Sequence, residues 1–265
     1  GNLSMVNEKF RKNPDNINIF LQLLLDYNNP ERALRRMNEV GFLGAFIPEF
    51  GRIVAMMQFN MYHSYTVDEH TIQCIINLAL IENKKLTEDL PLASEILQKG
   101  VNRKVIYLAL LLHDLGKGLP EDHSIAGAKI AYKVSRRLGL DATDSDLIVW
   151  LVRHHLLMSD IAQKRDISDP KTVEEFINTV KSKNRLNLLT VLTVCDIRGV
   201  GPQAWNNWKA VLIRQLYKDS LLALERGNVI SSADSIKTAK ETLKIHLKNS
   251  QHKFDEVSFE RHYDS

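Results

Sequence analysis

The sequence predicts an all-α fold. Apolar residues recur at helical spacing through most of the 265 residues, and the alternation that is typical of half-buried strands is scarce. The 12 glycines and 7 prolines lie mainly between the helical patterns, where they begin or end helices. A chain of this length fits one large domain or one domain with a helical extension.

Residues 1–45 are predicted to form linker helices that precede the core. Within them, Asn29-Pro30-Glu31 has the pattern of a helix start: a capping side chain, proline at the first helical position and an acid near the positive end of the helix dipole. Gly41 is predicted to end this helix. A second helix is expected after Pro48, and it would carry Ile53, Val54, Met56 and Met57.

Further helices are predicted over residues 68–80, 91–99, 102–115, 124–138, 145–156, 172–181, 186–197, 205–226 and 232–249. Asp144 and Asp146 open one of them, as helix caps and dipole partners. Trp205 and Trp208 stand three residues apart on another and are interpreted as packing residues rather than a partner-binding surface. We divide the chain into linker helices (1–45), a core domain (46–220) and a C-terminal helix and tail (221–265).

The composition argues against several classes of function. The 35 basic and 32 acidic side chains leave a formal charge of +3, which is too even to favour binding to nucleic acid or to a membrane surface. No apolar run approaches the roughly 20 residues of a transmembrane helix, and residues 1–5 lack the pattern of a secretion signal. Cys74 and Cys195 lie in apolar stretches and are expected to be buried free thiols. We therefore expect a cytoplasmic protein.

The chemistry concentrates in one part of the chain. Six of the nine histidines lie between residues 63 and 155. The apolar run Leu110–Leu112 leads directly into His113-Asp114, and burying an unpaired carboxylate costs several kcal/mol. Asp114 therefore needs a cation. A divalent metal would supply it, with the imidazole of His113 as a second ligand.

Lys117 follows Asp114 by one helical turn, so its ammonium group can reach the same cavity and meet a phosphate. The alternative is that His113-Asp114 is a surface dipeptide at a helix end. The apolar residues immediately before it favour the buried metal site.

His113-Asp114, within His-Asp-Leu-Gly-Lys, resembles the signature of the HD superfamily of metal-dependent phosphohydrolases. The resemblance implies a histidine upstream, at the start of a helix, and an aspartate downstream. His70 and Asp196 match these positions, and Asp196 is expected to end an apolar helix as Asp114 does. The implied ligands of one metal are His70, His113, Asp114 and Asp196.

Binuclear members of the superfamily carry further histidines around a second ion, which the Asp114 position bridges. His123, His154 and His155 resemble these histidines, although a lone histidine on a helix is more often a packing residue. Which of His154 and His155 is a ligand stays open, because adjacent helical residues diverge by about 100°. His63 either faces the same cavity or packs.

A closer resemblance covers roughly residues 30–218. Residues 48–54, 62–71, 152–158, 196–202 and 205–209 are similar, in order, to the bifunctional uridylyltransferase/uridylyl-removing enzymes of the PII nitrogen-signalling protein. The chain looks like their central, uridylyl-removing domain with flanking helices. No Gly-Ser turn precedes Asp144 and Asp146, so the paired aspartates of a nucleotidyltransferase are not expected here.

The resemblance implies hydrolysis of the bond between UMP and a tyrosine of uridylylated PII. Asp114 and Lys117 are candidate catalytic residues, and Arg153 and Arg198 are either catalytic or ordinary surface cations. The ligand types suit Mn, Fe, Zn or Ni, and the resemblance favours Mn or Mg, as one or two ions. Two alternatives are kept: hydrolysis of a free nucleotide or nucleotide messenger, and a metal-stabilised regulatory module that binds PII without turnover.

Overall fold

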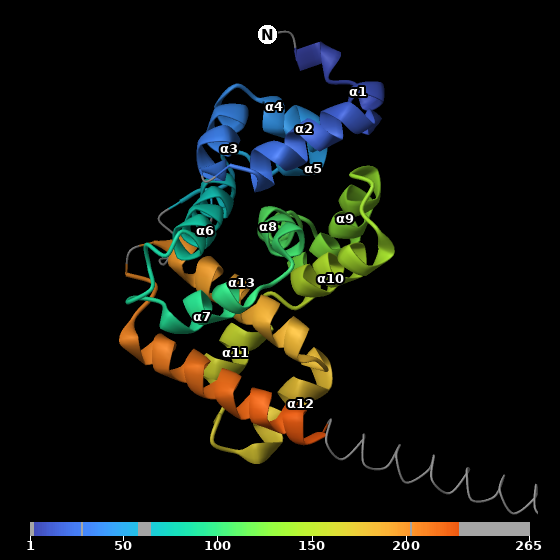
Figure 1. Ribbon diagram of the computed structural model, residues 1–265. Coiled ribbons are helices and arrows are strands. Elements are labelled where there is room, and N and C mark those ends of the chain that lie inside the picture. The colour runs from blue at the N-terminus through green and yellow to red at the C-terminus, as the bar shows by residue number, and fades with distance from the viewer. Residues whose placement is uncertain (1–2, 28, 58–64, 202, 228–265) are drawn as a thin grey trace, which may run out of the picture. The chain divides into compact units, whose positions relative to one another are not determined.

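The computed structural model describes residues 3–27, 29–57, 65–201 and 203–227, and all regular structure in them is helical (Figure 1). The predicted all-α fold is confirmed. The elements are a short 3-10 helix, Leu3–Met5, and the α-helices α1 (Glu8–Lys12), α2 (Pro14–Leu25), α3 (Pro30–Glu39), α4 (Phe42–Phe46), α5 (Pro48–Gly51), α6 (Val67–Glu82), α7 (Pro91–Lys99), α8 (Arg103–Leu112), α9 (His123–Arg137), α10 (Ala142–Arg153), α11 (Leu157–Lys164), α12 (Pro170–Val180) and α13 (Lys183–Val200). Residues 207–227 are helical as well.

The chain divides into two compact units, residues 1–220 and 221–265. All the named helices lie in the first unit. Among the described residues, no helix is long and apolar enough to cross a bilayer.

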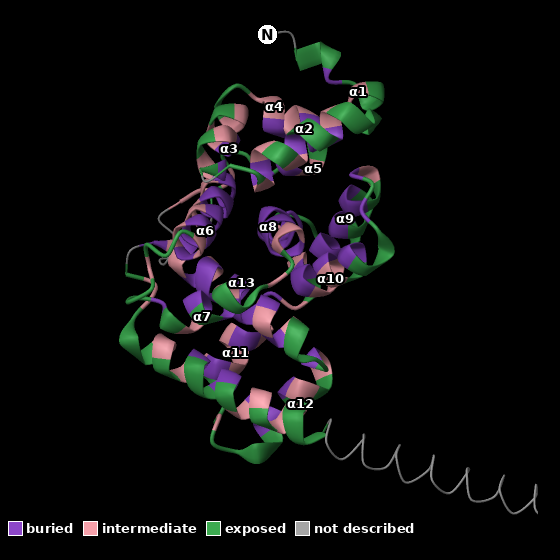
Figure 2. Ribbon diagram, viewed as in Figure 1, coloured by how far each residue is buried: buried purple, intermediate pink, exposed green. Residues whose placement is uncertain are grey.

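Helix α8 forms the centre of the first unit. It lies between α6 on one side and the pair α9 and α10 on the other, while α13 packs along α6 (Figure 1). Every residue from Val105 to Leu112 is buried, and Figure 2 shows most of α8 in the colour of buried residues. This run explains why the sequence offers no amphipathic stripe here: a helix that is covered on all sides is apolar on all sides.

Local capping explains where several helices begin. The side chain of Asn102 accepts a hydrogen bond from the amide of Val105, which starts α8. Asp122 accepts from the amides of Ser124 and Ile125, which makes His123 the first residue of α9. Such caps satisfy amide groups that have no partner within the helix.

The expected helix after Pro48 is wrong beyond its first turn. Helix α5 ends at Gly51, and Ala55 adopts a left-handed conformation with φ of 56°. The amide of Ala55 donates instead to the carboxylate of Asp68, 13 residues further along the chain, at 3.1 Å. A tertiary hydrogen bond therefore overrides the local helical pattern.

Two other expectations near helix starts need correction. The helix predicted over 145–156 is α10, and its cap is Asp141, which accepts from the amide of Asp144. Asp144 is buried and paired with Lys104 at 2.7 Å, so an ion pair rather than capping explains it. Trp208 is 57% exposed, so it is not the packing residue that its spacing suggested.

Candidate metal centre

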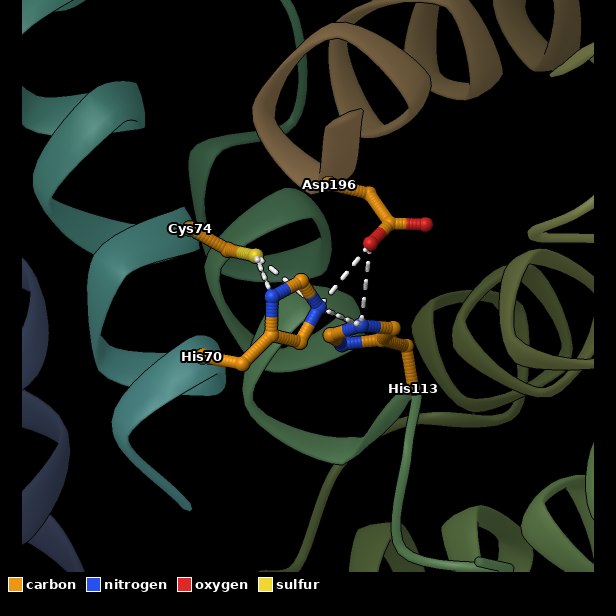
Figure 3. Close-up of side chains that lie close together, drawn as sticks. All are labelled: His70, Cys74, His113 and Asp196. Atoms are coloured by element: carbon orange, nitrogen blue, oxygen red, sulfur yellow. Dashed lines mark hydrogen bonds and ion pairs between the residues drawn. The ribbon is translucent and has the colours of Figure 1, made fainter. Parts of the chain in front are cut away.

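Three separate parts of the fold bring His70, His113, Asp114 and Asp196 together. His70 lies in the first turn of α6, and His113-Asp114 form the turn that follows α8. Asp196 lies within α13, four residues before the last residue of that helix rather than at its end, which corrects the expectation from the sequence. Figure 3 shows His70, His113 and Asp196 converging from these elements.

The distances in the first group fit one shared ion. His70 Nε2 lies 3.0 Å from Asp196 Oδ1 and 3.3 Å from His113 Nε2. Asp114 Oδ2 lies 3.5 Å from His70 Nε2 and 3.3 Å from His113 Nε2. Three potential ligand atoms from α6, α13 and the turn after α8 thus surround one point, with the Asp114 carboxylate beside them.

A second group lies on the other side of Asp114. Ligand atoms of Asp114, His123 and His155 all lie within 4.8 Å of one another. His155 Nε2 is 3.8 Å from Asp114 Oδ1, whereas the other oxygen, Oδ2, faces His70 and His113. The two oxygens of Asp114 therefore face different groups, as a bridging carboxylate requires.

The backbone orients two of the imidazoles. His113 Nδ1 lies 2.7 Å from the carbonyl of Leu110, and His155 Nδ1 lies 2.7 Å from the carbonyl of Val152. Because a carbonyl only accepts, each Nδ1 carries a proton and donates it, so Nε2 is the ring nitrogen that each histidine turns toward the cluster. His155 Nε2 is buried and lacks a hydrogen-bond partner among the described residues. A buried lone pair without a donor fits a metal ion.

The protonation states reflect a cluster of charges inside the protein. Burial alone would lower the pKa of His113, but the carboxylates of Asp114 and Asp196 outweigh it and raise this pKa to about 10. Burial would raise the pKa of Asp196, and hydrogen bonds from His113 and His70 hold it well below its usual value. Burial, reinforced by the charge on His113, lowers the pKa of His155 to about 4. Without a metal, His113 thus keeps a second proton, on Nε2, at the position where a cation would bind.

Two glycines allow the close packing that forms the site. A Cβ on Gly116 would lie 2.0 Å from the carbonyl oxygen of His123, so only glycine lets the turn after Asp114 touch the start of α9. A Cβ on Gly199 would lie 2.4 Å from the sulfur of Cys74 and 3.2 Å from His70 Nδ1. Gly199 therefore lets α13 approach α6 closely enough to bring Asp196 to His70.

The structure separates His154 from His155. Both lie in the turn between α10 and α11, beyond the end of α10, and not within a helix as expected. The ring of His154 packs against Trp150 at 5.1 Å between centroids, and burial lowers its pKa. The ring of His155 lies 5.4 Å from that of His113 and 5.3 Å from that of His123. Of the two, His155 joins the cluster and His154 does not.

The candidate catalytic cations lie at different places. Lys117 Nζ is 2.7 Å from Asp114 Oδ2, and the Lys117 side chain is 23% exposed. Arg153 donates to the hydroxyl of Ser124 at 2.9 Å, and Arg198 donates through Nε to the amide oxygen of Asn77 at 3.1 Å. Only Lys117 directly contacts the cluster. His63 lies outside the described residues.

Cys74 also lies in the first group, because ligand atoms of His70, Cys74, His113 and Asp196 all lie within 4.8 Å of one another; the sequence reasoning did not assign it to the site. It lies four residues after His70 on α6, and its sulfur is 3.6 Å from His70 Nε2 (Figure 3). Both cysteines are free and buried, as predicted. The spacing of four residues places Cys74 on the same face of the helix as His70, and that signal was available in the sequence.

Comparisons with known proteins match two parts of the chain to family models. Residues 67–197 match the family model described as HD domain, and residues 1–46 match the model described as Uridylyltransferase GlnD third domain. Three similar curated proteins are named bifunctional uridylyltransferase/uridylyl-removing enzyme. The protein from Ruegeria pomeroyi is 66% identical over 226 residues, which are 85% of this chain and 25% of that protein.

The protein from Cereibacter sphaeroides is 58% identical over 263 residues, which are 99% of this chain and 28% of that protein. The protein from Azospirillum brasilense is 50% identical over 261 residues, which are 98% of this chain and 28% of that protein. The chain thus spans between 25% and 28% of the length of these relatives.

Proposed function

We propose that the chain is a metal-dependent phosphodiesterase of the HD-domain family that removes UMP from a uridylylated tyrosine of a PII signal protein. The observation that carries the proposal is the convergence of His70, His113 and Asp196 on one point, with Asp114 beside them. The name of the relatives supports the uridylyl-removing activity. The resemblance of the sequence motifs supports PII as the substrate.

We assign the metal ligands from the two groups of side chains. His70, His113, Asp114 and Asp196 would hold one divalent ion, and Asp114, His123 and His155 would hold a second. Imidazole and carboxylate together suit several divalent metals, and we propose Mn or Mg. Two observations support this assignment: His155 Nε2 is buried without a hydrogen-bond partner among the described residues, and the hydrogen bond to the Leu110 carbonyl fixes the ring orientation of His113.

A divalent ion, when bound, supplies a nucleophile from water at neutral pH and neutralises charge on the phosphoryl group. The chain's own part is to hold the substrate and the charges around it. Lys117, beside Asp114 and partly exposed, is placed to donate to a phosphoryl oxygen that enters from solvent. The phenolate of tyrosine has a pKa near 10 and leaves readily, so strong general-acid assistance is not required.

Arg153 and Arg198 have supporting places in this scheme. Arg153 binds Ser124, the residue next to His123, and so holds the start of α9. Arg198 lies two residues after Asp196 and is held by Asn77. We propose that they help to neutralise the substrate's phosphate from the rim of the site, and that Lys117 does so at its centre.

The test is release of UMP from uridylylated PII by the wild-type chain with Mn²⁺. Asp196→Asn, which keeps the shape of the side chain, is expected to abolish release. His154→Ala removes a histidine outside the cluster and is the matched control, which is expected to retain activity. Release by Asp196→Asn at the wild-type rate would refute the assigned site.

Two further substrates separate the alternatives. Free nucleotides and a nucleotide messenger are assayed in parallel, with Mn²⁺ binding measured on the same preparation. Hydrolysis of these alone would indicate a small-molecule phosphohydrolase. Metal binding with no hydrolysis of any substrate would indicate a regulatory module.

A further inference from the structure

Two parts of the chain that match different family models meet at the first turn of α6. Residues 1–46 match the third-domain model, and the HD match begins at residue 67. Helix α3 belongs to the first part, and it packs against α6 (Figure 1). His70, a proposed metal ligand, lies in this turn of α6. The contacts between α3 and α6 therefore bear directly on the metal centre.

The first contact joins Asn38 of α3 to Asp68 of α6. Asn38 Nδ2 donates to Asp68 Oδ2 at 2.8 Å, while Asp68 Oδ1 accepts from the amide of Ala55 at 3.1 Å. Asp68 is buried, so the loss of either donor would leave a carboxylate oxygen without a partner away from water. Asp68 lies two residues before His70.

The second contact is a bidentate ion pair. Arg35 of α3 donates through Nη1 and Nη2 to the two carboxylate oxygens of Glu69, at 2.8 and 2.7 Å. Gln73, one turn further along α6, donates to the same carboxylate at 2.7 Å. A two-bond pair fixes direction as well as distance. Glu69 immediately precedes His70, so α3 holds both residues before the ligand.

The first turn of α6 lacks a side-chain cap. Thr66 precedes the helix in an extended conformation, and its side chain makes no capping hydrogen bond. Such a cap would stabilise the start of the helix. The polar contacts from α3 anchor this turn through its side chains instead. A metal ligand must lie within about 0.2 Å of its ideal distance, so the anchoring of this turn affects binding.

We propose that Arg35 and Asn38 are positioning residues for His70, so that α3 determines how tightly the metal centre binds its ion. The inference rests on the proposed metal-dependent function. It makes the segment that matches the third-domain model a part of the metal site's architecture, through Asp68 and Glu69. A displacement of α3 would change metal affinity without any change in the ligands.

The test compares two double variants of the full chain. Arg35→Ala with Asn38→Ala removes both contacts from α3 to α6. Arg36→Ala with Glu39→Ala removes an ion pair on the same helix that is 77% and 61% exposed, and it is the matched control. Calorimetric titration with Mn²⁺ is expected to show affinity about tenfold or more weaker for the first variant, as for other groups that support metal ligands. The control is expected to bind as wild type does.

A rescue variant separates positioning from general packing. Arg35→Glu with Glu69→Arg rebuilds the ion pair with its charges exchanged and is expected to restore most of the affinity that Arg35→Glu alone loses. A packing role alone would lower the melting temperature of the metal-free protein and leave Mn²⁺ affinity unchanged at temperatures well below melting.

The outcomes are distinct. Wild-type Mn²⁺ affinity in a folded Arg35→Ala, Asn38→Ala variant would overturn the inference and leave the proposed function standing. If that variant does not fold, Arg35→Lys keeps the positive charge but cannot form the paired hydrogen bonds to Glu69. Unchanged Mn²⁺ affinity in Arg35→Lys would then overturn the inference equally. No Mn²⁺ binding by the wild-type chain would overturn the proposed function and the inference together.

Discussion

Gly199→Ala is expected to push α13 away from α6 and to weaken metal binding. The new Cβ would lie 2.4 Å from the sulfur of Cys74 and 3.2 Å from His70 Nδ1. Ordinary van der Waals contact begins near 3.5 Å, so the two helices or the cysteine side chain must move by about 1 Å. The same movement would separate His70 from Asp196, whose ligand atoms are now 3.0 Å apart.

The magnitude follows from the cost of overpacking. Inserting a methyl group into a close-packed interior costs about 1–3 kcal/mol. Each kcal/mol lowers the melting temperature by about 2–4 °C in a domain of this size. A displacement of about 1 Å exceeds the tolerance of roughly 0.2 Å for a metal ligand, so Mn²⁺ affinity is expected to fall by at least about tenfold.

The assay is a double-mutant cycle with Cys74→Ala, which removes the sulfur that the new methyl group meets. Urea unfolding of the metal-free protein and Mn²⁺ titration are measured for the wild type, both single variants and the double variant. Cys74→Ala is expected to relieve part of the clash, so the double variant should be more stable and bind Mn²⁺ more tightly than additivity predicts, by about 0.5–3 kcal/mol.

Gly44→Ala is the matched control for overpacking away from the site. Its Cβ would lie 2.9 Å from the Cα of Gly51, so it should lower stability and leave Mn²⁺ affinity unchanged. Additive behaviour of Gly199→Ala and Cys74→Ala in both assays would refute the reasoning. Equal loss of Mn²⁺ affinity in Gly44→Ala would do so as well, because the effect would then follow from general destabilisation.

Two further predictions concern the metal ligands, and a third concerns an ion pair away from the metal centre. His155→Ala should remove the second Mn²⁺ from the binding stoichiometry while His154→Ala retains it; equal stoichiometries would contradict the assignment. Because neighbouring carboxylates raise the pKa of His113 to about 10, the metal must displace its proton, so Mn²⁺ affinity should rise by about tenfold per pH unit between pH 6 and 8. A flat calorimetric profile would argue against this. Glu49 is held by Arg137 at 2.6 and 3.0 Å, which outweighs burial and lowers its pKa. Its folded pKa lies below the unfolded value of 4.5, so its stabilisation is complete above that value and is lost on acidification. Glu49→Gln should therefore cost about 1–3 kcal/mol at pH 7 in urea unfolding and much less at pH 3; an equal cost at both would exclude the pairing as the cause.

Local signals in the sequence were enough for most of the helices. Proline at the start of α3, α7 and α12 and the apolar run of α8 indicated them correctly, because caps, proline positions and periodicity act within a few residues. The region after Pro48 was predicted wrongly, because the amide of Ala55 pairs with Asp68, a residue 13 positions away. Helix α11 was not predicted, since its eight residues present only a short pattern.

The sequence by itself determined the all-α class and the candidate ligands His70, His113, Asp114 and Asp196. It did so because a carboxylate at the end of a buried apolar run needs a cation, and because the motif order resembles one family. Only the tertiary structure decided that His155 rather than His154 faces the cluster, since a turn and not helical spacing orients them. The close approach of α13 to α6 at Gly199, which brings distant residues within 3.0 Å, likewise depends on packing between segments far apart in the chain.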